Sequence, residues 1–203
     1  MNKKTFNNLT QSFEGFKPLL NEQKELKRLL SKNKRRLITL EKKYVFLKNL
    51  VGIDVKDDLL VSSIFNFFKE LGFNEIKNVD KRYRKEDLRI IFDKKLFLLE
   101  ITGSEKANAK DNKTRQLTKH LEKERLNNQN VFGLTIFNHD NKKDYLEREI
   151  NCFSKDQITY AKDGKYGLIT TVELLNAFKK IKEGKLSIED FKKEILKFGE
   201  VKF

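Results

Sequence analysis

Two short apolar runs, residues 90–92 and 96–101, lie on either side of Asp93-Lys94-Lys95 and constrain this chain more than any other feature. They are rich in β-branched, aromatic and leucine side chains and are too short for helices, so they predict an antiparallel β-hairpin. Asp87 precedes the first run, and Glu100 falls near the end of the second. Because those two ends are neighbours in a hairpin, we expect the two carboxylates to converge on one divalent cation.

The position of Glu100 favours a functional role. An aspartate at the start of a strand is often a turn former, and a glutamate at a strand end is often solvated. Glu100, however, directly follows the apolar residues 96–99, which predict a central, buried strand. Burying a carboxylate there without a compensating partner would cost free energy of folding. Asp87 and Glu100 are therefore better explained as a functional site than as solvated surface residues.

The charge balance indicates an anionic partner. Lysine and arginine number 44 against 30 aspartates and glutamates, which gives a formal net charge of +14. An excess of this size is typical of nucleic-acid-binding proteins, with a solvated lysine-rich surface as the alternative. One basic cluster directly precedes Asp87, where it would hold a phosphodiester backbone beside the carboxylates; it consists of Lys81, Arg82, Arg84 and Lys85.

The rest of the chain predicts one α/β domain with an accessory helix in front. Around the hairpin we expect a helix to residue 70, a strand over 73–79, a helix over 113–127 and a strand over 131–137. The order strand, helix, strand favours a parallel crossover. Further on, residues 145–150 suggest a short helix and residues 157–161 a fifth strand. Two helices then close the chain, the first capped by Thr170 or Thr171 and the second by Ser187 with Asp190.

Residues 19–51 carry apolar side chains in a three-four alternation, which predicts a long amphipathic helix. The series is Leu26, Leu30, Leu37, Leu40, Tyr44, Leu47 and Val51, with Asn33 interrupting it. Such a helix either pairs with a second copy as a coiled coil or packs on its own domain. The preceding residues 1–18 are polar, end at the only proline and predict an irregular lead-in.

Several function classes are excluded. The chain has no P-loop, no Gly-x-Gly-x-x-Gly and no Gly-x-Ser-x-Gly motif, so nucleotide hydrolysis and esterase chemistry lack support. Its single cysteine, Cys152, rules out an internal disulfide framework. No apolar run approaches the roughly 20 residues of a membrane span, and no signal peptide is evident, so we expect a cytoplasmic protein.

The order of elements, with one acid before the second strand and another near the end of the third, resembles the restriction-endonuclease-like superfamily, the PD-D/E-x-K nucleases. Asp87 and Glu100 match its two acidic positions. The family continues with Glu-x-Lys, whereas this chain reads Glu100-Ile101-Thr102, so the lysine is replaced. Gln116 is similar to a glutamine that many members carry on the next helix, and His120 stands where some have tyrosine. The resemblance covers roughly residues 52–184.

The resemblance implies a central mixed β-sheet flanked by helices and a metal-dependent endonuclease, acting on DNA in defence or repair. Asp87, Glu100 and the backbone carbonyl of Ile101 would hold Mg²⁺ or Mn²⁺, while Thr102 and Gln116 would position water or phosphate. Three cations would contact nucleic acid, and one of them would supply the positive charge of the missing lysine: Lys106, Arg115 or Lys119.

The expected organisation is a lead-in (1–18), a long helix (19–51), a nuclease-like core (52–170) and a C-terminal helical hairpin (171–203). The alternative function is a catalytically inactive nuclease fold that binds nucleic acid or a protein partner as a subunit of a complex. A basic interaction protein built on the coiled coil is a third reading.

Overall fold

The computed structural model of the chain describes residues 14–55, 57–79, 86–106, 111–128 and 130–203. The chain divides into two compact units, Met1–Val45 and Phe46–Phe203. Within the described residues, no helix has both the length and the apolar character needed to cross a membrane.

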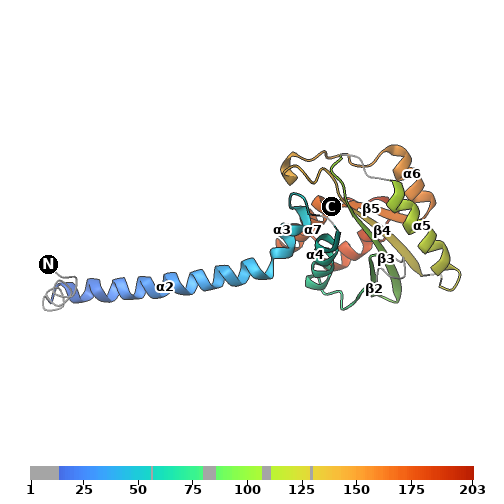
Figure 1. Cartoon of the computed structure of the whole chain (residues 1–203). Helices are drawn as coiled ribbons and strands as arrows, with labels where there is room; N and C mark the ends of the chain where they lie inside the picture. The colour runs from blue at the N-terminus through green and yellow to red at the C-terminus, as the bar shows by residue number, and fades with distance from the viewer. Residues whose placement is uncertain (1–13, 56, 80–85, 107–110, 129) are drawn as a thin grey trace. The chain divides into compact units, whose positions relative to one another are not determined.

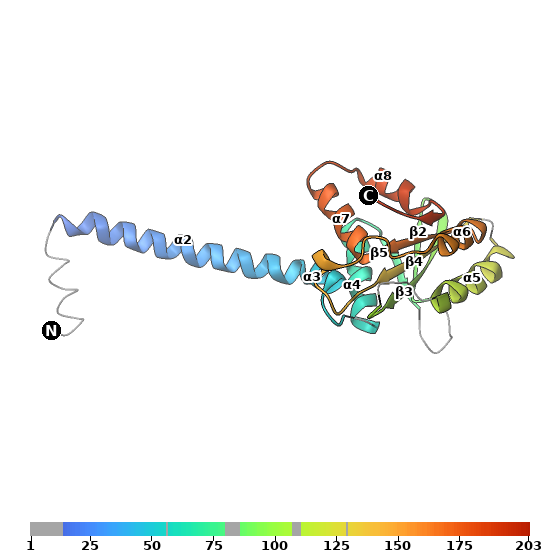
Figure 2. The same ribbon diagram turned by 90° about the horizontal axis from the view of Figure 1, so that it is seen from above.

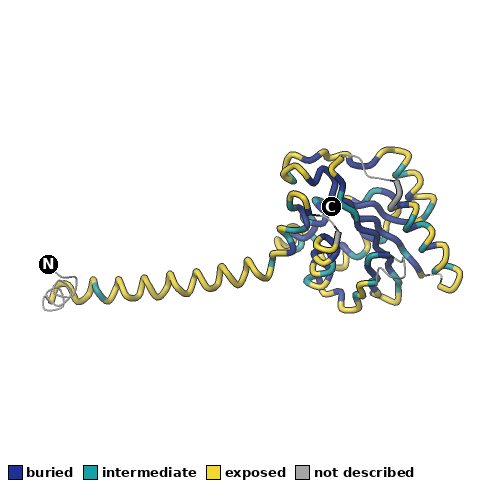
Figure 3. Tube along the Cα trace, in the orientation of Figure 1, coloured by how far each residue is buried: buried dark blue, intermediate teal, exposed yellow. Residues whose placement is uncertain are grey.

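The first unit contains the long helix α2 (Phe16–Lys43). Pro18 lies in its first turn, where the missing N–H is tolerated. None of its 28 residues is buried (Figure 3). Its exposed leucines include Leu26, Leu30 and Leu37. The helical pattern expected over residues 19–51 is realised as two helices, because Tyr44 separates α2 from α3 (Val45–Val51).

The second unit is built on a six-stranded mixed sheet in the order β1-β2-β3-β4-β5-β6 (Figure 1). The strands β1 to β3 are antiparallel, and β3 to β6 are parallel. Their bounds are β1 (Glu75–Asn78), β2 (Leu88–Phe92), β3 (Lys95–Gly103), β4 (Val131–Asn138), β5 (Tyr166–Thr170) and β6 (Gly199–Glu200). The predicted hairpin is confirmed as β2 and β3, and the predicted parallel crossover as β3 and β4.

Asp93 and Lys94 form the tight turn that joins β2 to β3. Both residues have positive φ, 48° and 61°. Two successive positive φ values are the signature of the tight turn whose twist matches that of an antiparallel strand pair, and aspartate tolerates this conformation better than most residues. This turn fixes the register, which pairs Leu88 with Leu99 at the far end of the hairpin.

Helices cover both faces of the sheet (Figures 1 and 2). On one face, α5 (Asp111–Arg125) and α6 (Lys155–Asp163) share a buried cluster with Leu98 and Phe137 of the strands. Aromatic rings link the remaining helices, α4 (Asp57–Glu70), α7 (Thr171–Lys182) and α8 (Ile188–Ile195), through Phe67, Phe178 and Phe191. The predicted helices over the corresponding residues of α4, α5, α7 and α8 are confirmed.

Two local predictions were wrong. Residues 157–161, expected as a strand, belong to α6, because Ser154 and Gln157 form a reciprocal capping box that starts a helix there. The fifth strand is instead the fully buried β5. The short helix expected over residues 145–150 is reduced to a single 3₁₀ turn at Tyr145–Glu147.

A buried arginine joins the loop after β4 to the start of the second unit. Arg148 is 6% exposed. Its guanidinium donates to Val51 O at 2.7 Å and to the side-chain oxygen of Asn138 at the end of β4. Asn138 in turn donates to Val55 O at 2.8 Å and accepts from the Thr171 hydroxyl at 3.1 Å. These bonds fasten α3, β4 and α7 together at the carboxyl end of the parallel strands.

Next to this network, His139 makes stability depend on pH. Its Nε2 lies 2.8 Å from Glu149 O, and the residue is 2% exposed. Burial lowers the pKa of His139, the neighbouring Arg148 charge lowers it further, and the Glu149 carbonyl and the Asp140 and Glu149 charges oppose this. The folded protein therefore keeps His139 neutral at a pH where the unfolded chain already binds a proton.

We expect the free energy of unfolding to fall as the pH drops below about 6.5, the usual value for histidine, until the lower folded-state pKa is reached. Urea unfolding at pH 7.5 and 5.5 would measure this loss. His139→Gln should show a smaller loss than the wild type, and an equal loss in both proteins would contradict the assignment.

Candidate active site

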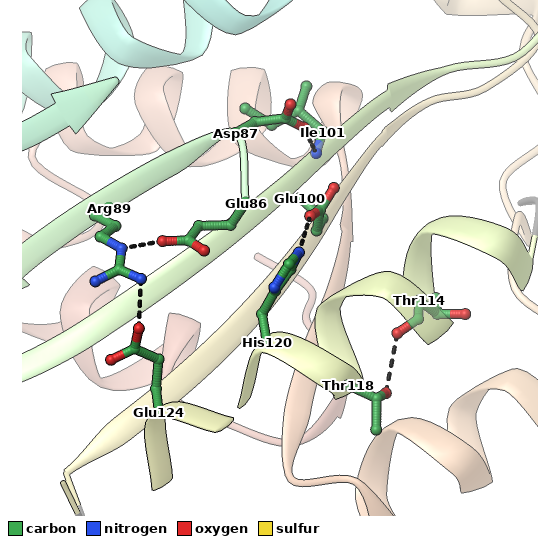
Figure 4. A network of polar contacts seen from close by, with 9 residues as sticks. All are labelled: Glu86, Asp87, Arg89, Glu100, Ile101, Thr114, Thr118, His120 and Glu124. Atoms are coloured by element: carbon green, nitrogen blue, oxygen red, sulfur yellow. Dashed lines mark hydrogen bonds and ion pairs between the residues drawn. The ribbon is translucent and has the colours of Figure 1, made fainter. Parts of the chain in front are cut away.

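The hairpin register places Asp87 directly before β2, beside the part of β3 that carries Glu100. Asp87 forms a bend directly before β2, and its Oδ2 accepts a hydrogen bond from the Ile101 backbone N–H at 2.8 Å (Figure 4). The Asp87 N–H donates to Leu99 O at 3.0 Å. Asp87 is thus held one step beyond the last β2–β3 pair, next to the stretch of β3 that carries Glu100.

Glu100 is fully buried in the central strand β3, with an exposed fraction of 0%. Side chains alternate along a strand, so Glu100 points to the same face as Leu98, toward α5. There its Oε1 lies 3.7 Å from His120 Nε2 (Figure 4). The sequence-based expectation of a carboxylate in a central buried strand is confirmed.

His120 is biased toward its neutral form. Burial lowers the pKa of His120, and the Arg89 and Lys123 charges lower it as well, while the Glu86 and Glu124 charges oppose them. A neutral imidazole carries a lone pair on one ring nitrogen. It can therefore act as a hydrogen-bond acceptor or a metal ligand.

Sequence reasoning missed an ion-pair chain beside these residues. Glu86 is 1% exposed and pairs with Arg89 Nε, and Arg89 Nη2 contacts Glu124 Oε1 of α5 at 2.6 Å (Figure 4). In β2 the half-buried Arg89 lies between the buried Leu88 and Ile90. The predicted strand begins at residue 90, so it does not include this alternation of buried and polar residues. These ion pairs connect the start of β2 to α5, the helix that carries His120.

The structure places the other described site residues at the end of β3, on α5 and in the loop that follows β3. Thr102 is half-buried near the end of β3, with its hydroxyl 3.5 Å from Gly103 O, and Gln116 is half-buried on α5. The cations Arg115 and Lys119 of α5 and Lys106 of the following loop are exposed. Lys81, Arg82, Arg84 and Lys85 fall in residues 80–85, outside the described part of the chain.

The donor set suits a hard divalent cation. Within the described ranges, no three His, Cys, Asp or Glu side chains are grouped closely enough to hold a metal ion. Mg²⁺ in proteins usually takes only one or two carboxylates and completes its shell with water and substrate oxygens. Glu100 can serve as such a carboxylate, because an ionised acid at 0% exposure is stabilised by a nearby positive charge.

A separate cavity of about 380 Å³ opens beyond the carboxyl ends of β4 and β5. Its walls include Tyr145, Arg148, Phe153 and Glu173. Because these residues belong to the loop after β4 and to α7, the cavity is distinct from the pair formed by Asp87 and Glu100.

Comparisons with known proteins define the fold. The chain is similar to restriction endonuclease FokI bound to DNA, with 15% sequence identity and a TM-score of 0.56, over 79% of this chain and 30% of that one. A second FokI structure gives 16% identity and a TM-score of 0.54, over 78% and 30%. This chain therefore spans about 30% of the length of the FokI chains it matches. No protein-family model and no curated protein matches the sequence. The fold is restriction-endonuclease-like, which confirms the predicted fold class.

Proposed function

We propose that this protein is a metal-dependent nuclease whose site is formed by Asp87 and Glu100. The observation that carries the proposal is the complete burial of Glu100 in the central strand of a restriction-endonuclease-like sheet. Burying an acid costs free energy of folding. Acids in such environments are concentrated at functional sites. The match of both acids to the PD-D/E-x-K positions supports the same conclusion.

The proposed chemistry is hydrolysis of a phosphodiester bond. Asp87, Glu100 and the Ile101 carbonyl would hold Mg²⁺ or Mn²⁺, which when bound polarises the phosphate and lowers the pKa of water. Asp87 is already oriented by the Ile101 N–H. Thr102 and Gln116 would hydrogen-bond the attacking water or a phosphate oxygen, with Thr102 in place of the superfamily's lysine.

Nucleic acid, with DNA as the first candidate, is the substrate that the charge supports. The second unit exposes Lys106 in the loop after β3 and Arg115 and Lys119 on α5. The helix α2 adds ten lysines and arginines against three glutamates, a net charge of +7. Both sets would contact the sugar–phosphate backbone, so binding should weaken steeply as salt is raised.

The cleavage test compares the wild type with Asp87→Asn on plasmid and oligonucleotide substrates in Mg²⁺, Mn²⁺ or EDTA. We expect metal-dependent cleavage by the wild type, its loss in Asp87→Asn, and salt-sensitive binding by both proteins. Lys94→Gln, in the turn at the opposite end of the hairpin, serves as the control and should cleave normally. Binding without cleavage in every metal would favour the inactive nuclease-fold subunit instead.

We further propose that α2 pairs with a second copy of itself. Leu26, Leu30, Leu37 and Leu40 follow the spacing of a coiled-coil seam, and all are more than half exposed. Asn33 occupies a seam position, where asparagine commonly fixes register and oligomeric state.

Two adjacent residues provide a matched test of this pairing. Leu37 lies on the seam and Ile38 beside it, with exposures of 58% and 51%. Leu37→Gln should weaken self-association, measured by sedimentation equilibrium, at least about tenfold because a buried apolar contact is lost. Ile38→Gln should leave it within about twofold. Equal effects of the two substitutions, or a monomeric wild type, would rule out the seam.

A further inference from the structure

The contact between Glu100 and His120 combines two different metal-binding atoms. Glu100 Oε1 on β3 and His120 Nε2 on α5 lie 3.7 Å apart, and both atoms are shielded from solvent. His120 Nε2 has no hydrogen-bond partner among the described residues. Figure 4 shows the imidazole directed at the carboxylate.

The separation suits two ligands of one ion. Nitrogen and oxygen donors bind divalent metals at about 2.0–2.2 Å, so two donors of the same ion lie roughly 3 to 4 Å apart. The side-chain types also carry information about the metal. Mg²⁺ takes oxygen ligands, whereas imidazole nitrogen suits transition metals, and Mn²⁺ accepts both kinds.

The packing of α5 holds His120 in place. Leu117 and Leu121, on either side of it along the helix, are fully buried against the sheet. Directly beneath them β4 has Gly133, where an added Cβ would lie 2.7 Å from Leu121 Cδ1 and 3.1 Å from Leu117 Cδ2. The glycine therefore permits a close approach of the helix, which brings the imidazole within reach of Glu100.

We propose that His120 is a ligand of the metal ion held by Glu100, and that the site consequently prefers Mn²⁺ over Mg²⁺. This inference rests on the metal site of the proposed nuclease. It assigns the ion two protein donors that lie in contact with each other, Glu100 on β3 and His120 on α5. The ion pair between Arg89 and Glu124 then helps to hold α5, and with it His120, against the hairpin.

Electron paramagnetic resonance of Mn²⁺ bound to the full-length protein tests the proposal without measuring activity. The wild type should show electron spin-echo modulation from a coordinated ¹⁴N nucleus. In His120→Phe this modulation should vanish, and Mn²⁺ affinity should fall at least about tenfold. Mg²⁺ should displace Mn²⁺ from the variant at a concentration lower by a similar factor. His139→Gln is the histidine control and should retain the signal.

The possible failures are distinguishable. In one, the wild type binds Mn²⁺ without ¹⁴N modulation and this binding is lost in Glu100→Gln. That result would overturn the role of His120 while supporting the proposed metal site. A wild type that binds no Mn²⁺ would overturn both. Should His120→Phe fold poorly by circular dichroism, the wild-type spin-echo spectrum still decides, because it needs no substitution.

Discussion

Glu100→Gln is expected to reduce metal-dependent cleavage of nucleic acid by about 100- to 1,000-fold, the usual loss when one group that stabilises the transition state is removed. Glutamine keeps the volume of the side chain but removes its negative charge, which the bound cation requires. Because Glu100 is fully buried in β3, no solvent-exposed acid can easily take over its position. Single-turnover cleavage rates with Mg²⁺ and with Mn²⁺ measure the effect.

Stability provides the internal control for this prediction. Burial of a charge is costly, so Glu100→Gln, which removes that charge, should unfold in urea at least as late as the wild type. Glu124→Gln, at a partly exposed acid of α5 that contacts Arg89, should cleave within about tenfold of the wild-type rate. A Glu100→Gln protein that remains fully active would remove this residue from the catalytic site.

Arg148→Met should produce the largest loss of stability, about 3 kcal/mol or more, because each buried acceptor left without its donor costs about 1–3 kcal/mol. The acceptors are the carbonyl of Val51 and the side chain of Asn138, with weaker contacts to Gly52 O and Lys143 O. Methionine keeps an unbranched apolar stem but lacks the guanidinium group, so the loss reports mainly the hydrogen bonds. Urea denaturation at pH 7.5 gives the free energy of unfolding.

Lys143→Met is the control, since Lys143 lies in the same loop, its side chain is exposed, and its ammonium group contacts the Asp140 carboxylate at 3.4 Å. It should change stability by less than about 0.5 kcal/mol. Equal losses in the two variants would show that Arg148 does not fasten α3 to β4.

The hairpin could be predicted because its signals are local. Apolar runs of strand length, a turn beginning at Asp93 and the two flanking acids all lie within a few residues of one another. Its antiparallel pairing then places Asp87 beside the strand that carries Glu100 by geometry alone. The parallel position of β4 likewise follows from the handedness rule for strand–helix–strand units.

The remainder depends on partners far apart in the sequence. Arg148 bonds to Val51, 97 positions away, and Arg89 to Glu124, 35 positions away, so neither contact has a local signature. In α6 the capping pair Ser154 and Gln157 outweighed the strand propensity of the residues that follow. The contact of His120 with Glu100 depends on how closely α5 approaches the sheet, which Gly133 permits.

Cleavage by the wild-type protein in molar excess over labelled DNA and RNA, with Mn²⁺, Mg²⁺ or EDTA, tests the central claim most directly. A nuclease centred on Asp87 and Glu100 predicts strand scission that requires Mg²⁺ or Mn²⁺ and stops in EDTA. Intact substrate under every condition, with salt-sensitive binding retained, would contradict it and leave a nucleic-acid-binding protein on a nuclease fold.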